Sequence, residues 1–227
     1  MKLKERVGEA LKILCANHGV VLARYTEGAR KSRLQNVVEL RAQGRLLQNP
    51  AEGCQLISAL EATKNIEGDI AEVGTAGGGS ARLIGEYSAG KNIHVFDTFE
   101  GLPDPGPLDV KFSKGAYAHS VESVREFLKD LPVEFHKGMF PESAASSQDC
   151  RFSFVHLDVD LYQSTLDSLK FFYPRVNPGG IIITHDYITS DGVNRAFEEF
   201  FADKPESPIE LIGYQGMVVK FSQAIPA

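Results

Sequence analysis

Residues 69–80 read Asp69-Ile-Ala-Glu-Val-Gly-Thr-Ala-Gly-Gly-Gly-Ser80, and this stretch decides the fold. Its first five residues have the length and apolar character of a buried strand. The glycines after them allow the backbone to turn sharply and to approach a ligand closely. A helix is predicted to follow over residues 80–88. A strand, a glycine-rich turn and a helix in this order open one unit of a parallel sheet.

Downstream of this unit, short apolar runs alternate with helical stretches. The apolar runs are 93–96, 133–135, 152–157 and 180–184, and the helical stretches are 121–128, 163–173 and 193–201. This alternation is typical of right-handed βαβ units in a sheet covered on both faces. Two further runs, 209–212 and 217–221, flank a Gly-Tyr-Gln-Gly turn that indicates a hairpin. We therefore expect an α/β, doubly wound Rossmann-like sheet with a C-terminal antiparallel hairpin.

Two regions fall outside this alternation. Residues 1–66 lack strand patterning and carry apolar residues at helical spacing, which predicts an N-terminal helical segment before a main domain over residues 67–227. Residues 101–117 are rich in Pro and Gly and too polar for a helix or strand. They predict a mobile loop over the carboxyl ends of the strands, where doubly wound folds bind their ligands.

Composition narrows the classes of partner. The formal net charge is -6 and no dense block of Lys or Arg is present, which argues against a nucleic-acid partner. The three cysteines are widely spaced and form no CxxC pair, as in a reduced, cytosolic protein. The apolar run over residues 11–22 is interrupted by polar residues, so we expect neither a secretory signal nor a membrane span. The expected location is the cytoplasm.

The glycine-rich turn and the second strand indicate a cofactor site. The glycines fail the dinucleotide pattern GxGxxG because Ala76 holds its middle position. Glu72, near the end of the first strand, would repel a pyrophosphate but suits a cofactor that carries a sulfonium and an ammonium group. Asp97 ends the second strand and could accept both hydroxyl protons of a ribose. The alternative is that both acids are ordinary turn and cap residues.

A second acidic group follows the next two strands. Asp158 and Asp160 lie two residues apart, so in extended chain they share a face, and His185 and Asp186 end the neighbouring strand. Carboxylates that converge repel one another, and a divalent cation relieves the repulsion. Such a cation would also lower the pKa of a bound hydroxyl, after which a carboxylate can take its proton. Alternatively, these acids are solvated caps without a metal.

His185 has three possible roles. It could ligate a softer metal than magnesium, act as an auxiliary base or cap its strand.

Together these motifs resemble the macrocin O-methyltransferase (TylF-like) family, which modifies sugar hydroxyls in antibiotic biosynthesis. The resemblance covers roughly residues 68–201. It rests on Glu72-Val-Gly with Gly78-Gly-Ser80, Phe96-Asp-Thr-Phe-Glu-Gly-Leu-Pro103, His136-Lys-Gly-Met-Phe-Pro141, His156-Leu-Asp-Val-Asp-Leu-Tyr162, Pro178-Gly-Gly180 and His185-Asp-Tyr187.

The resemblance implies a class I methyltransferase that uses S-adenosyl-L-methionine. It implies Mg²⁺ at Asp158 and at the pair after the fifth strand, with Asp160 as the general base. The family typically has Asp-Asp-Tyr where this chain has His185-Asp186-Tyr187, which leaves Mn²⁺ or another cation as an alternative. The expected metal ligands are Asp158, His185 and Asp186. The expected cofactor-binding residues are Glu72, Gly74, Thr75, Ser80, Asp97, Thr98, Gly138, Phe140 and Asp158.

The expected function is therefore metal-assisted O-methylation of a small-molecule hydroxyl, with the sugar of a natural product favoured. From the family we also expect a homodimer, with residues 1–66 as a lid or dimerisation segment, and no nucleic-acid or membrane partner. Two alternatives stay open. One is an NAD-dependent oxidoreductase on the same kind of sheet. The other is a protein that binds S-adenosyl-L-methionine but no longer catalyses, because His185 departs from the family pattern.

Overall fold

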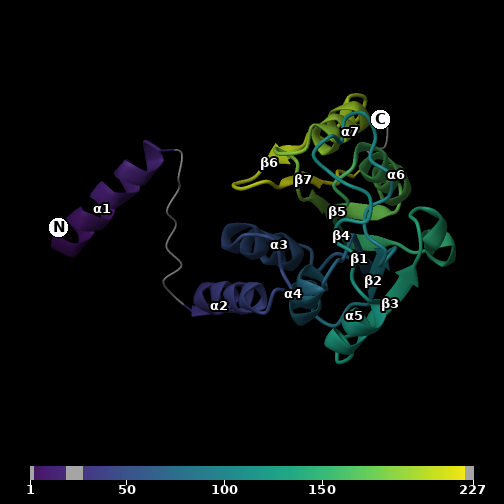
Figure 1. Ribbon diagram of the computed structural model, residues 1–227, viewed down its shortest axis with the longest axis horizontal. Helices are drawn as coiled ribbons and strands as arrows, with labels where there is room; N and C mark the ends of the chain where they lie inside the picture. The colour runs from purple at the N-terminus through teal and green to yellow at the C-terminus, as the bar shows by residue number, and fades with distance from the viewer. Residues whose placement is uncertain (1–2, 19–27, 223–227) are drawn as a thin grey trace.

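A computed structural model describes residues 3–18 and 28–222 of the chain. Of the predicted helical segment 1–66, residues 1–2 and 19–27 lie outside the described residues. The remainder of that segment forms α1 (Leu3–Ala16), α2 (Gly28–Ala42) and α3 (Pro50–Ala62). Helix α1 stands apart from the other elements (Figure 1). None of the helices among the described residues combines the length and the apolar character needed to cross a bilayer.

The main body is a seven-stranded sheet in the order β3-β2-β1-β4-β5-β7-β6. Five strands are parallel, and β7 pairs antiparallel with both β5 and β6. The predicted doubly wound sheet with a closing hairpin is thus confirmed. The strands are β1 (Asp69–Val73), β2 (Ile93–Asp97), β3 (Val133–Lys137), β4 (Phe152–Leu157), β5 (Val176–Thr184), β6 (Ile209–Glu210) and β7 (Gly216–Val219).

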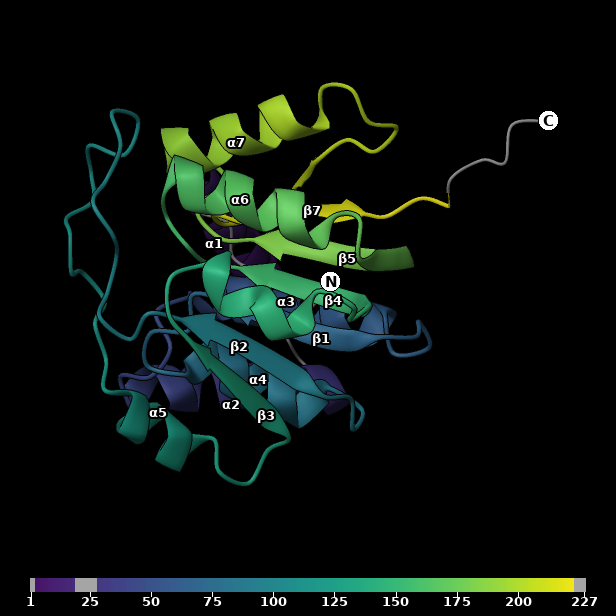
Figure 2. The same ribbon diagram turned by 90° about the vertical axis from the view of Figure 1, so that its right-hand side faces the viewer.

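Helices cover both faces of the sheet, so the central strands β1, β2 and β4 are buried along almost their whole length. The covering elements are α4 (Gly79–Tyr87), α5 (Val121–Phe127), the short 3₁₀ helix η1 (Glu142–Ser147), α6 (Tyr162–Phe172) and α7 (Asp191–Phe201). One core packs η1, α6 and α7 against one face, and a second packs α3, α4 and α5 against the other (Figure 2). A third core joins Val37 of α2 to Ile57 of α3 and Leu83 of α4.

The glycine-rich turn between β1 and α4 lies at the point where the strand order reverses, since β2 and β3 lie on one side of β1 while β4 and β5 lie on the other. Gly74 has a φ of +83°, and a Cβ built on it would lie 1.9 Å from the main-chain oxygen of Asp158. A Cβ on Gly79 would lie 2.4 Å from the main-chain oxygen of Arg45. Only glycine permits these approaches.

Candidate active site

A cavity of about 280 Å³ opens at the carboxyl ends of β1, β2, β4 and β5, which is where the sequence places it. Its wall includes the glycine-rich turn, the end of β2, the segments that follow β4 and β5, and residues 45–48 between α2 and α3. All but one of the site residues expected from the sequence line it. They are Gly74, Thr75, Ser80, Asp97, Thr98, Gly138, Phe140, Asp158, Asp160, His185 and Asp186.

Glu72 is the exception, because it is not among the residues that line the cavity. The residue is fully buried behind the cavity wall. One carboxylate oxygen accepts a 2.6 Å hydrogen bond from the Thr75 hydroxyl, and the other lies 2.9 Å from Nδ1 of His156. Nε2 of His156 in turn lies 3.0 Å from the side-chain amide nitrogen of Gln48. Glu72 is therefore placed to orient Thr75, which lines the cavity, and His156 behind it.

Asp97 ties the glycine-rich turn to β2. One carboxylate oxygen accepts hydrogen bonds from the backbone N–H groups of Thr75 at 2.7 Å and Ala76 at 3.0 Å, and the other accepts one from Phe99 at 2.6 Å. A carboxylate offers roughly four acceptor positions. Three are occupied here by backbone N–H groups of the chain, which leaves one acceptor position free.

The predicted convergence of Asp158, His185 and Asp186 is confirmed. Nδ1 of His185 lies 2.9 Å from an Asp186 oxygen and 3.4 Å from an Asp158 oxygen. Nε2 lies 3.3 Å from a carboxylate oxygen of Glu52. Burial opposes protonation of this imidazole, but the surrounding carboxylates outweigh burial and raise the pKa of His185 to about 11.

Asp160 faces the same cavity and is buried. Burial, together with the nearby charges of Asp158 and Asp186, raises the pKa of Asp160 to about 9. Both Asp160 and Asp186 have a positive φ, 60° and 57°, which is unfavourable for a residue with a side chain. Ala76 and Tyr117 share this conformation and also line the cavity. Backbone strain of this kind clusters at functional sites.

Glu52, a site residue that the sequence reasoning missed, comes from α3. Its carboxylate accepts hydrogen bonds from the backbone N–H of Asn49 at 2.7 Å and of Tyr214 at 3.0 Å, besides facing His185. Burial raises the pKa of Glu52, but the bonds to His185, Asn49 and Tyr214 outweigh burial and hold it below its usual range. The spacing Asn49-x-x-Glu52 is a capping box, which marks a helix start but gives no hint of the contact with His185.

The donor set at Asp158, His185 and Asp186 fits a divalent cation that displaces the proton of His185, because an imidazole ligand must be neutral. One ligand atom from each residue lies within 4.8 Å of the others. Two carboxylates with one imidazole suit Mn²⁺ or another transition cation better than Mg²⁺, which prefers oxygen ligands throughout.

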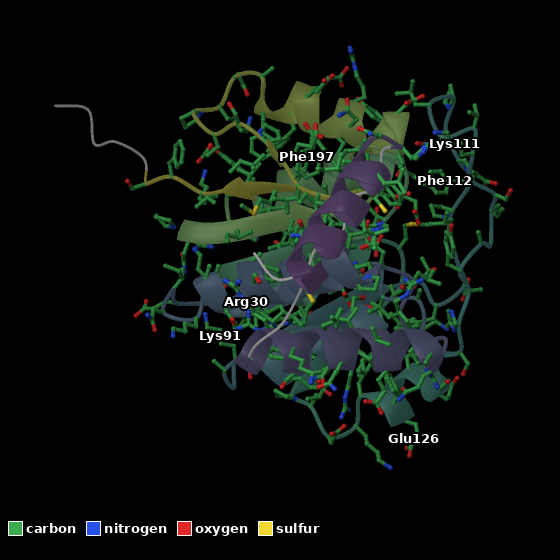
Figure 3. All side chains as sticks on the ribbon, turned by 90° about the vertical axis from the view of Figure 1, so that its left-hand side faces the viewer. Arg30, Lys91, Lys111, Phe112, Glu126 and Phe197 are labelled. Atoms are coloured by element: carbon green, nitrogen blue, oxygen red, sulfur yellow. The ribbon has the colours of Figure 1, made fainter. Side chains whose placement is uncertain are left out.

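The loop over residues 98–120 runs past the carboxyl ends of the strands, from β2 towards α7 (Figure 2). It contributes Leu102, Phe112 and Tyr117 to the cavity wall. Figure 3 shows Phe112 and Lys111 side by side on this loop, and Nζ of Lys111 donates a 2.7 Å hydrogen bond to the carbonyl of Thr189. This bond joins the loop to the segment that precedes α7.

Asp109 is the main anchor of this loop and is 2% exposed. Its two oxygens accept hydrogen bonds from the backbone N–H of Tyr162 at 3.0 Å and of Gly106 at 3.1 Å. Tyr162 is the first residue of α6, whose own N-cap, Leu161, makes no capping bond. Asp109 therefore caps α6 from a distant part of the chain.

We expect Asp109→Ala to lower the free energy of unfolding by about 1–3 kcal/mol, because it leaves two backbone N–H groups without a partner. Urea unfolding measures this loss. Asp104→Ala is the matched control, since Asp104 lies in the same loop with a side chain 80% exposed. The control should change stability by at most about 0.5 kcal/mol. Equal effects of the two substitutions would show that Asp109 is not an anchor.

Comparison with known proteins identifies the family. The family described as Macrocin-O-methyltransferase (TylF) matches residues 54–220. One relative is the 8-demethyl-8-(2,3-dimethoxy-alpha-L-rhamnosyl)-tetracenomycin-C 4'-O-methyltransferase of Streptomyces olivaceus. It is 32% identical over 140 residues, which are 54% of this chain and 54% of that protein. The demethyldecarbamoylnovobiocin O-methyltransferase of Streptomyces niveus is 30% identical over 156 residues, which are 61% of this chain and 60% of that protein. The chain thus matches little more than half the length of these curated relatives.

Solved structures support the fold. The O-methyltransferase NovP superposes with a TM-score of 0.72 at 23% identity, over 81% of this chain and 88% of NovP. An O-methyltransferase from Bacillus cereus, solved in complex with SAH, has a TM-score of 0.59 at 18% identity over 93% of this chain and 97% of its own. Because the family match spans most of the sequence, from the third helix to the last strand, the chain belongs to the macrocin O-methyltransferase (TylF) family.

Proposed function

We propose that this protein transfers a methyl group from S-adenosyl-L-methionine to a hydroxyl of a small molecule, with the sugar of a natural product as the favoured acceptor. The observation that carries the proposal is that the buried carboxyl group of Asp160 lines the same cavity as the glycine-rich turn. A methyl donor held at that turn and a hydroxyl held at Asp160 would share one enclosed space.

The donor half of the cavity lies along the glycine-rich turn, Asp97 and Phe140. Gly74 lets the turn pack directly against the main chain of Asp158, just after β4, which fixes the position of the turn in the cavity wall. Asp97 supplies one acceptor position for a ribose hydroxyl. The acids in the cavity wall, which include Asp97 and Asp186, favour a cationic sulfonium donor over the pyrophosphate of NAD.

The acceptor half lies between the 98–120 loop and the wall formed by Gln48 and Tyr214. Tyr117 and Phe112 of the loop offer flat apolar surface, and Gln48, Asp160 and His185 offer polar groups. This mixture suits a sugar attached to an apolar scaffold. The names of the curated relatives, which include a rhamnosyl-tetracenomycin and a novobiocin precursor, point to the same class of acceptor.

In the proposed reaction, Asp160 takes the proton of the acceptor hydroxyl while the oxygen attacks the methyl carbon in line with the departing sulfur. The raised pKa makes its ionised carboxylate a stronger base than that of an ordinary Asp. The products are a methyl ether and S-adenosylhomocysteine. Asp158, His185 and Asp186 would hold a divalent cation, which when bound lowers the pKa of the hydroxyl.

Methyl transfer from labelled S-adenosyl-L-methionine to a panel of glycosylated natural products and nucleotide-linked deoxysugars tests this function. The expected result is label on a sugar oxygen, located by NMR, with one S-adenosylhomocysteine formed per methyl ether. Donor binding without transfer to any hydroxyl acceptor would instead favour the non-catalytic alternative.

We expect removal of divalent cations with a chelator to slow methyl transfer at least tenfold, and Mn²⁺ to restore the rate at lower concentration than Mg²⁺. The reason is the imidazole in the donor set. His185→Asp, which restores the acidic pair of the family, should shift the preference towards Mg²⁺. If the chelator leaves the rate unchanged, the reaction needs no divalent cation, although Asp160 could still act as the base.

A further inference from the structure

A second group of metal-ligating side chains lies away from the cavity, on the sheet face that η1 and α6 cover. His94 comes from β2, and Glu134 and His136 come from β3, the strand at the sheet edge. Glu134 and His136 are two residues apart and His94 is in register with Glu134, so the three side chains share a face. His94 is 5% and His136 8% exposed, whereas the Glu134 side chain is 62% exposed. The group is thus buried on one side and open to solvent on the other.

The three potential ligand atoms form a compact triangle. Nδ1 of His94 lies 3.0 Å from Nε2 of His136. Oε1 of Glu134 lies 3.5 Å from that nitrogen of His136, and Oε2 lies 3.7 Å from that nitrogen of His94. With one oxygen of Glu134 taken as the ligand, all three sides of the triangle are within 4.8 Å. Ligands bound about 2.0–2.1 Å from a tetrahedral Zn²⁺ are about 3.4 Å apart. The triangle therefore has the dimensions of one face of such a site.

The ring nitrogens of His94 and His136 that point away from the cluster each have an oxygen partner, as the second ring nitrogen of a metal-bound histidine usually has. Nε2 of His94 lies 3.3 Å from a carboxylate oxygen of Asp69, and Nδ1 of His136 lies 3.4 Å from the Ser146 hydroxyl. The Asp69 carboxylate favours the tautomer of His94 that carries its proton on Nε2. Nδ1 of His94, which faces the cluster, then keeps its lone pair for the ion. The Ser146 hydroxyl can accept the proton on Nδ1 of His136 in the same way, which leaves the lone pair on Nε2 of His136.

We propose that His94, Glu134 and His136 form a binding site for a divalent transition cation of the Zn²⁺ type, with water in the open fourth position. Two imidazoles with one carboxylate favour Zn²⁺, Co²⁺ or Ni²⁺ over Mg²⁺. The bound ion would clamp the edge strand β3 to β2. His94 precedes Asp97 by three residues of extended chain, about 10 Å. The site is therefore separate from the methyl-transfer chemistry.

Cobalt binding to the full chain tests the proposal in a His185→Ala background, because that substitution removes the imidazole from the ligand set of the cavity and leaves only the carboxylates of Asp158 and Asp186 there. After treatment with a chelator, we expect this variant to bind about one Co²⁺ per chain with tetrahedral visible absorption, and Zn²⁺ to displace it. We expect Zn²⁺ to raise the melting temperature of this variant, because a bound ion stabilises the folded state. Adding Glu134→Gln should weaken the affinity for Co²⁺ at least tenfold and abolish that rise. Glu134 is exposed, so this substitution does not endanger folding.

Two further variants complete the test. Glu126→Gln is the matched control, because Glu126 is an exposed acid on α5 with a side chain 73% exposed, and it should leave Co²⁺ affinity unchanged. Cys150→Ser tests a different ligand set, Asp69, His94 and Cys150, whose potential ligand atoms also lie within 4.8 Å of one another. The proposal is overturned if the His185→Ala protein binds no Co²⁺, if Glu134→Gln leaves the affinity unchanged, or if Cys150→Ser weakens binding instead.

Discussion

Asp160→Asn should slow methyl transfer by about 10²–10⁴-fold, the range expected for loss of a general base. The side chain of Asn has the same shape but cannot take the hydroxyl proton. Asp160 donates a hydrogen bond to Asp186 in its protonated form, and the amide of Asn can donate the same bond. The substitution therefore removes the base while it preserves the packing of the acidic cluster.

Affinity for S-adenosylhomocysteine separates this loss from a structural defect. The Asp160→Asn protein should bind the product nearly as well as the parent, because the donor half of the cavity is intact. Asp203→Asn is the control, with a side chain 83% exposed, and should leave the rate unchanged. If Asp160→Asn turned over at the parent rate, Asp160 would not be the base.

The second large effect is expected for Gly74→Ala, which should abolish detectable donor binding and lower the melting temperature. The new Cβ would lie 1.9 Å from the main-chain oxygen of Asp158, so β1 and β4 must separate at the point where they enter the cavity. Backbone hydrogen bonds from Asp158 to Val73 and from Gly74 to Phe96, both 2.9 Å, would be disturbed as well.

Gly90→Ala is a matched control for this substitution. Gly90 has nearly the same φ, +82°, but a Cβ there would meet nothing within 4 Å. Both variants carry the cost of a left-handed backbone, about 1 kcal/mol, and only Gly74→Ala adds the clash. Calorimetry and thermal unfolding compare the two. Equal donor affinity in the two variants would mean that the glycine-rich turn does not form the donor site.

The fold was accessible from the sequence because its signals are local. Residues 69–80 specify a strand, a turn and a helix within one short window, and the Gly-Tyr-Gln-Gly turn specifies the closing hairpin in the same way. The convergence of Asp158 and Asp186 also followed from general rules, because neighbouring parallel strands end at the same edge of the sheet. These expectations needed no knowledge of side-chain packing.

The missed features depend on contacts between distant parts of the chain. Glu52 reaches His185 across 133 positions of sequence, and nothing in a capping box indicates that partner. Glu72 was expected in the cavity because it is near a strand end, but strand alternation gives the face of a side chain and not its access to the cavity. Pro and Gly in the 101–117 segment indicate irregular backbone, yet only the fold brings Asp109 to the start of α6.

The central claim is that the cavity at the ends of β1, β2, β4 and β5 binds a methyl donor. Isothermal titration of the purified chain with S-adenosylhomocysteine, and separately with NAD, tests it most directly. We expect one S-adenosylhomocysteine per chain with a Kd on the order of micromolar, and no measurable heat with NAD. Binding of NAD without binding of S-adenosylhomocysteine, or binding of neither, would contradict it.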